Sequence, residues 1–312
     1  MKLRGLLLGA AVALTMAPPA LAERASDGNV SIIYWQAPSI LNPYLSSGTK
    51  DIESSSLVIE PLGRYTETGA MVPYLAKEIP TVANGGVSSD LKSITWKLKD
   101  GIMWSDGSPV TSADVKFTAD YCMNSDMGCA QLAKFDHVTS IDTPDSATVV
   151  VSFAQPMPNP YGPFMGGQSP IIQMAQFENC TGAKAQSCTE QNFGPIGTGP
   201  FVVTEFRPND VIQMKANDNY RDPSKPAFAT LTFKGGGDAM GAGRSVLETG
   251  EFDYAWNLQL APDVIAKMEA GGKGGAIAGS GPLVERLALN MTDPSPALDA
   301  DTRATAAAPA PP

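Results

Sequence analysis

The sequence contains a single histidine, His137, among 312 residues. Catalysis of the Ser-His-Asp kind would have to pass through that one imidazole, and no G-x-S-x-G sequence accompanies it. His137 precedes a predicted strand, which favours a surface or hydrogen-bonded structural histidine. The chain also lacks the H-E-x-x-H, EF-hand and phosphate-loop sequences, and its acidic residues are scattered. The sequence therefore predicts no catalytic residue, no metal site and no cofactor.

Positively charged residues are scarce as well. The chain has 22 Lys and Arg against 32 Asp and Glu, which gives a net charge of -10. Residues 1–22 carry Lys2 and Arg4 and no acid, so the chain without them has a net charge of -12. Attraction to nucleic acid or to anionic lipid is excluded for a chain of this charge. We interpret the acidity as a solubility feature.

Long hydrophobic runs are absent, and the one at the N-terminus is short. Lys2 and Arg4 precede an apolar run from Leu6 to Met16, and Ala20-Leu21-Ala22 matches a small-residue cleavage site. A membrane-spanning helix needs about 20 apolar residues, so the pattern predicts a secretory signal peptide, residues 1–22, cleaved after Ala22. The alternative is a buried N-terminal helix. Export predicts a periplasmic location.

Only four cysteines are present, and they form two close pairs: Cys122 with Cys129, and Cys180 with Cys188. An exported protein enters an oxidising compartment, which favours disulfides. Pairing within each couple gives two short loops, although three connectivities are possible in principle. Neither spacing is C-x-x-C and His137 does not stand beside them, which makes zinc binding the weaker alternative.

Hydrophobic periodicity predicts a β-rich chain with several helices. Thr111 is the expected N-cap of one helix, with Asp114 three residues on. Strands are expected at residues 30–35, 93–99, 148–153, 201–206, 211–216, 231–233 and 284–290, with a buried strand at 252–256. Helices are expected at residues 54–62, 238–248 and 262–270, and at the segment after Thr111. Residues 297–312 are Ala- and Pro-rich without periodicity and are predicted to be disordered.

Three stretches of the sequence stand out by their order and spacing. The first is Glu60-Pro61-Leu62 with Gly69–Ala76, and the second is Thr95–Val115, which contains Trp104-Ser105-Asp106-Gly107. The third is Pro195–Phe201, followed by Asn219-Tyr220 and then by Glu248–Asp253. Together they resemble the substrate-binding proteins of bacterial peptide, dipeptide and nickel importers, the extracellular solute-binding proteins of family 5. The resemblance covers residues 30–296.

The resemblance implies an α/β fold, namely a lobe of the type II periplasmic-binding-protein kind with an inserted mixed α+β domain. The implied organisation is a first lobe from residues 23–63 and 193–296 and an inserted domain at 64–192. Trp96 and Trp104 are then structural residues of the inserted domain. In the family a second lobe follows, and here that lobe is missing, which leads us to expect a truncated chain.

The resemblance also implies a ligand held between two lobes, with closure sensed by an inner-membrane ABC permease. The positions that resemble the cleft lining are Tyr34, Trp35, Gln36, Tyr254, Trp256, Asn257 and Gln259. Trp35 and Trp256 have a structural alternative as core residues. The expected partner is a short peptide or another small solute, bound by a monomer. A nickel chelate, an oligosaccharide, an opine, an antibiotic, a secreted hydrolase or a fragment that binds nothing are the alternatives.

Overall fold

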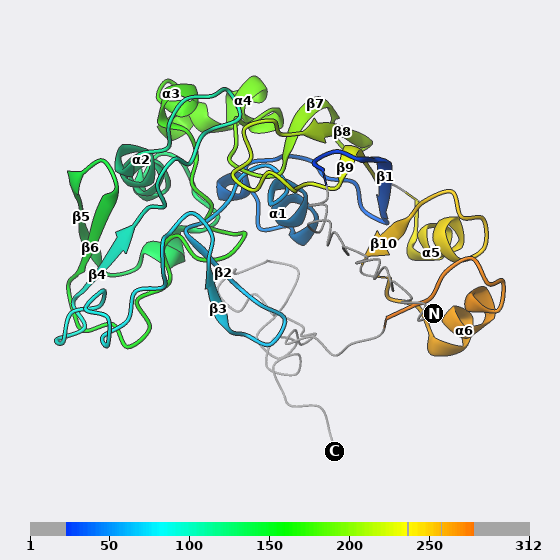
Figure 1. Cartoon of the computed structure of the whole chain (residues 1–312), viewed down its shortest axis with the longest axis horizontal. Helices are drawn as coiled ribbons and strands as arrows, with labels where there is room; N and C mark the ends of the chain where they lie inside the picture. The colour runs from blue at the N-terminus through cyan, green and yellow to red at the C-terminus, as the bar shows by residue number, and fades with distance from the viewer. Residues whose placement is uncertain (1–22, 236, 257, 278–312) are drawn as a thin grey trace, which may run out of the picture. The chain divides into compact units, whose positions relative to one another are not determined.

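A five-stranded mixed sheet holds the N-terminal strand between two parallel neighbours in the computed structural model, which describes residues 23–235, 237–256 and 258–277. Its strands, in spatial order, are β10 (Tyr254–Trp256), β1 (Asp27–Tyr34), β9 (Phe228–Gly235), β8 (Val211–Ala216) and β7 (Phe201–Arg207). β1 pairs in parallel with both β10 and β9, whereas β8 and β7 extend the sheet as an antiparallel hairpin (Figure 1).

Alternation along these strands supplies one hydrophobic core. Leu231 and Phe233 on β9 are almost completely buried, as are Ile212 and Met214 on β8. They pack with Tyr34 and with residues that follow α1 (Thr49–Ser55). The expected strands at 30–35, 201–206, 211–216 and 231–233 are therefore confirmed, although β9 begins three residues earlier than its apolar centre suggested.

A second hydrophobic core lies under a three-stranded antiparallel sheet in the order β4 (Ser93–Lys97), β6 (Thr148–Phe153) and β5 (Val138–Asp145). α2 (Ser112–Met123) packs against β5 and β6 (Figure 1). Trp96 is fully buried, and Trp104 is 1% exposed, which confirms that both are structural. The residues of this core lie mainly inside the predicted inserted domain, whose bounds at 64 and 192 stay a prediction.

An acidic side chain takes part in capping the N-terminus of α2, as the sequence indicated. The backbone N–H of Thr111 donates to Asp114 over 2.9 Å, and the Thr111 hydroxyl donates to the same oxygen. The other carboxylate oxygen of Asp114 accepts from the backbone N–H of Met174. Asp114 therefore satisfies the helix start and fixes the neighbouring segment to it.

Both cysteine couples form disulfides in the predicted pairing, Cys122–Cys129 and Cys180–Cys188. The first closes the end of α2 onto the loop after it. The smaller elements of this region are β2 (Gly63–Tyr65), β3 (Met71–Pro73), η1 (Pro43–Leu45), η2 (Leu132–Phe135), α3 (Met174–Phe177), η3 (Gly182–Ser187) and α4 (Thr189–Phe193). β2 and β3 pair as an antiparallel hairpin.

The helix predicted at residues 54–62 was wrong in position. The structure has α1 at Thr49–Ser55, and the chain leaves the helix before Glu60. Two serine hydroxyls, Ser55 and Ser56, donate to the carbonyl of Ile52, which offers the backbone an alternative to further helical bonds. Glu60 also precedes a proline, a position that disfavours helical backbone.

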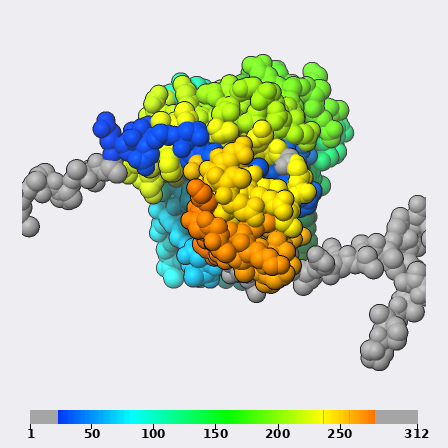
Figure 2. Space-filling model, turned by 90° about the vertical axis from the view of Figure 1, so that its right-hand side faces the viewer, coloured from blue at the N-terminus to red at the C-terminus, as the bar shows by residue number. Residues whose placement is uncertain are grey.

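The strand predicted as buried at 252–256 is short and lies at the sheet edge. Among the described residues β10 pairs with β1 alone, and Tyr254 is 49% exposed. α5 (Ala239–Leu247) packs against β10, β1 and α6 (Pro262–Glu269), and Figure 2 shows the two helices in yellow and orange. Both helices were expected from the sequence.

The predicted signal peptide at 1–22, the strand at 284–290 and the disordered segment at 297–312 lie outside the described residues. Within the part of the chain that the structure describes, none of the helices has the length and apolar character needed to cross a bilayer.

Candidate functional site

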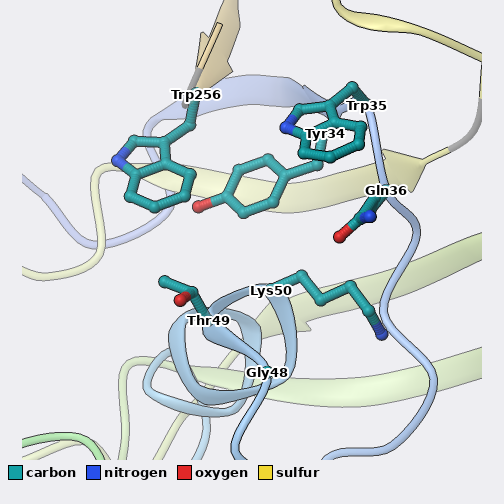
Figure 3. A pocket seen from close by; sticks show the side chains of 7 residues that line it. All are labelled: Tyr34, Trp35, Gln36, Gly48, Thr49, Lys50 and Trp256. Atoms are coloured by element: carbon teal, nitrogen blue, oxygen red, sulfur yellow. The ribbon is translucent and has the colours of Figure 1, made fainter. Parts of the chain in front are cut away.

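The parallel strands β1, β9 and β10 end at the same edge of the sheet. Tyr34, the last residue of β1, is paired with Trp256 on β10 and with Gly235 on β9. Ligand sites of open α/β sheets form outside the carboxyl ends of such strands. A pocket opens at this edge in the structure, and its lining residues are Tyr34, Trp35, Gln36, Gly48, Thr49, Lys50 and Trp256 (Figure 3).

Two aromatic rings form the upper side of the pocket in Figure 3. The Tyr34 and Trp256 rings are stacked, with centroids 5.2 Å apart and planes inclined by 19°. The Tyr34 ring also packs against the ring of Phe233, and their centroids lie 4.4 Å apart. Tyr34 is thus anchored in the core and offers its stack to the pocket, while Trp256 is only partly buried.

The hydroxyl of Tyr34 donates a 2.5 Å hydrogen bond to Glu53 on α1. Burial raises the pKa of the Tyr34 phenol far above its usual range, and the bond to Glu53 adds to the shift. Burial also raises the pKa of the Glu53 carboxyl, with the Tyr34 bond opposing it. This contact holds α1 beneath the end of β1.

Lys50 reaches into the lower part of the pocket in Figure 3 with its charge already paired. Its ammonium lies 3.0 Å from Asp51 and donates to Ser39 over 2.9 Å. Burial opposes ionisation of Asp51, but hydrogen bonds from Ser39, Ser46 and Lys50 outweigh it and hold the pKa of Asp51 below its usual range. The Lys50–Asp51 pair therefore contributes no net charge.

A close backbone approach brings Trp35 and Gln36 to the pocket. Gly235, at the end of β9, touches Ala37, and a Cβ at Gly235 would lie 2.0 Å from the Ala37 Cα. Only glycine permits this contact. The chain after β1 can therefore cross the end of β9 and turn the partly exposed Trp35 and the exposed Gln36 over the pocket.

The structure brings four of the seven predicted cleft residues together: Tyr34, Trp35, Gln36 and Trp256. Tyr254 lies on β10 two residues before Trp256 and is not part of the lining, and Gln259 is exposed away from it. Asn257 lies outside the described residues. Both tryptophans are partly buried, and Trp256 packs against the core of the five-stranded sheet, so their role in a cleft stays a prediction.

Sequence reasoning missed the lower side of the pocket, which Gly48, Thr49 and Lys50 form. They escaped notice because the helix was expected five residues later. The pocket measures about 100 Å³, well below the roughly 300–1,000 Å³ typical of ligand sites.

No group of three or more metal-ligating side chains occurs among the described residues. His137 is exposed, has a φ of 64° and lies in the region of β5, distant in the chain from every lining residue. Its backbone carbonyl accepts from Ala154. The described part of the chain thus offers the pocket an aromatic stack, the amide of Gln36, the hydroxyl of Thr49 and the paired ammonium of Lys50.

Residues 70–305 match the family described as bacterial extracellular solute-binding proteins, family 5. Among curated proteins, Protein XP55 of Streptomyces lividans is 29% identical over 234 residues, which are 74% of this chain and 39% of that protein. The chain spans about a third of the length of the curated relatives it matches, 31% to 39% in two of them.

Two solved structures share the fold. The ABC transporter substrate-binding protein CtaP of Listeria monocytogenes has a TM-score of 0.66 at 24% identity, over 79% of this chain and 47% of CtaP. The oligopeptide-binding protein AppA of Bacillus subtilis, solved with a nonapeptide, has a TM-score of 0.66 at 21% identity, over 74% of this chain and 44% of AppA. The expected α/β fold with a periplasmic-binding-protein lobe is thereby confirmed.

Proposed function

This chain belongs to the bacterial extracellular solute-binding proteins of family 5, and from that premise we propose that it acts as the solute receptor of an ATP-driven importer for short peptides. The Tyr34–Trp256 pocket forms one wall of the ligand site. The partner that receives the ligand is an inner-membrane permease, and the receptor works as a periplasmic monomer. It acts by binding alone, with no bond-making step.

The observation that carries the proposal is the stack of Tyr34 and Trp256. Two segments far apart in the sequence supply these rings, and the sheet places them at one pocket at the carboxyl ends of parallel strands. Rigid aromatic faces accept varied side chains, while amides such as that of Gln36 pair with a peptide backbone. A wall of this composition suits a receptor that takes many sequences.

Calorimetry of the full 312-residue chain with a mixture of synthetic tripeptides and pentapeptides tests the proposal. We expect saturable heat that is lost in Trp256→Leu, because the variant removes the aromatic face. Tyr65→Leu is the matched control, since Tyr65 is a 50% exposed aromatic on β2 and does not line the pocket. Its binding should equal that of the unchanged chain.

Titrations with other ligand classes test the alternatives to peptide binding. Heat with a nickel–histidine chelate, an oligosaccharide or an opine, and none with peptides, would overturn the peptide assignment and retain the receptor. Absence of heat with every class would overturn the receptor itself. Turnover of any peptide during the titration, followed by chromatography, would contradict action by binding alone.

A further inference from the structure

The pocket has a negative charge beside it that no cation of the described residues neutralises. Glu53 is half-buried on α1, and the Tyr34 hydroxyl donates a hydrogen bond to it. None of the ion pairs among the described residues involves Glu53. Burial raises the pKa of this carboxyl, as expected for an acid that lacks a cationic partner.

Lys50 is the cation nearest to this acid in the chain, and it is committed elsewhere. Its ammonium is held by Asp51 and Ser39. The Asp51 carboxylate also accepts from Ser46 and from the backbone of Ser39, so this pair is fully hydrogen-bonded. The pocket region therefore carries the net charge of Glu53.

Tyr34, which donates to this acid, belongs to an aromatic stack. Tyr34 and Trp256 are stacked, and Tyr254 lies two residues before Trp256, on the same face of β10. Burial and the charge of Glu53 raise the pKa of the Tyr254 phenol. Aromatic faces and a carboxylate together attract cations.

A purely structural role leaves the carboxylate unexplained. A glutamine at position 53 would accept the same hydrogen bond from Tyr34 without the cost of burying a charge. The carboxylate of Glu53 would contribute most to binding free energy when a cation enters the pocket. A partly desolvated ion pair interacts more strongly than the same pair in water.

We propose that the Tyr34–Trp256 pocket selects a cationic group of the ligand, an ammonium or guanidinium, through Glu53, which the Tyr34 hydroxyl contacts, and the face of Trp256. This specificity rests on the proposed receptor function, since it names the ligand chemistry of that same pocket. The positively charged end seats against the carboxylate, and an uncharged group of the same shape gains only the aromatic contact.

Two matched probe pairs test this specificity on the full chain at low ionic strength. The first pair is the peptide Ala-Lys-Ala and its norleucine analogue, measured by calorimetry. The second pair is choline and its uncharged carbon analogue dimethylbutanol, measured by tryptophan fluorescence. We expect the charged member of each pair to bind about tenfold more tightly, a ratio that corresponds to one charge-assisted contact.

The variant Glu53→Gln should bring both ratios close to one, whereas Glu67→Gln, the same change at an exposed site, should leave them intact. Equal binding of Lys and norleucine peptides to the unchanged chain overturns the cation specificity and leaves the receptor function standing. Glu53-dependent binding of choline without any peptide binding upholds the specificity and overturns the peptide assignment. Ratios unaffected by Glu53→Gln, or no binding of either pair, overturn the specificity.

Discussion

The guanidinium of Arg221 donates two hydrogen bonds to the carboxylate of Glu60, one of them 3.0 Å long. Glu60 is 1% exposed and also accepts from Thr198 over 3.1 Å. It follows Ile59, which packs in the core of the five-stranded sheet, and precedes Leu62, which packs in the other core. This ion pair therefore fixes the junction between the two cores.

Arg221→Met should destabilise the chain by about 3 kcal/mol, because it leaves a buried carboxylate without its cation. This loss of stability is at the low end for buried ion pairs because the Arg221 side chain is 20% exposed. Urea unfolding followed by tryptophan fluorescence measures the change. Arg207→Met, which removes exposed pairs to Glu205 and Asp210, is the control and should cost about 0.5 kcal/mol or less.

The double variant Glu60→Gln/Arg221→Met sharpens this prediction. Removing the carboxylate along with the guanidinium takes away the unpaired charge, so much of the lost stability should return. A double variant as unstable as Arg221→Met alone would mean that the arginine acts through packing on Tyr74 and Tyr220 rather than through the charge of Glu60.

Two acids on α1 should respond to pH in opposite directions. The folded-state pKa of Glu53 is raised, so its ionised form destabilises the fold at high pH, and this penalty disappears as the pH falls to about 4, near its unfolded pKa. Glu53→Gln should therefore raise the urea midpoint at pH 8 and change it little at pH 4. A midpoint lowered at pH 8 would contradict the raised pKa.

Asp51 supplies the matched comparison. Its folded-state pKa is lowered, so its contribution to stability is present above its unfolded pKa of about 3.9 and is lost as the pH falls through the folded value. Asp51→Asn should lower the urea midpoint at pH 8 and at pH 5 alike, and the loss should shrink only below about pH 4. If the urea midpoints of the two variants changed in the same direction across this pH range, burial alone would determine the pKa shifts of both acids.

The sequence predicted much of the fold because local patterns agreed with the final packing. Alternation at Ile94 and Trp96, the capping pair of Thr111 and Asp114, and two close cysteine couples each required only neighbours in sequence. The helix at Thr49–Ser55 was misplaced because its start has no side-chain N-cap and its fixed end depends on serine hydroxyls and on Arg64, which donates to Ser56.

The candidate site was predictable only in part. Tyr34, Trp35, Gln36 and Trp256 could be named from a family resemblance, but their meeting depends on the parallel pairing of β1 with β10, which no local pattern encodes. Thr49 and Lys50 were missed with their helix. The role of Glu53 required the position of Tyr34 and the knowledge that Lys50 pairs with Asp51.

The two disulfides give a prediction that peptide mapping can check. Cyanogen bromide cuts after Met123 and Met127, inside the Cys122–Cys129 loop, and trypsin cuts after Lys184, inside the Cys180–Cys188 loop. Each pair of fragments should stay linked until a reductant is added. Removing either disulfide by a double Cys→Ser change should cost about 2 to 3 kcal/mol, as expected for short loops. A linkage between the two couples would contradict the structure.

Gly235 controls the upper side of the pocket through its contact with Ala37. A Cβ at this position would lie 2.0 Å from the Cα and 2.5 Å from the backbone nitrogen of Ala37, so Gly235→Ala must move the backbone that carries Trp35 and Gln36. We expect a loss of about 3 kcal/mol in urea unfolding, at the high end for overpacking because backbone atoms must shift. Gly28→Ala on β1 is the control, since a Cβ there meets nothing within 4 Å, and its stability should be unchanged or slightly raised. Gly235→Ala should also lose the heat of ligand binding under conditions where it remains folded. If the two variants were equally stable, the backbone at the end of β9 would move without a loss of folding free energy, and Gly235 would not position the pocket.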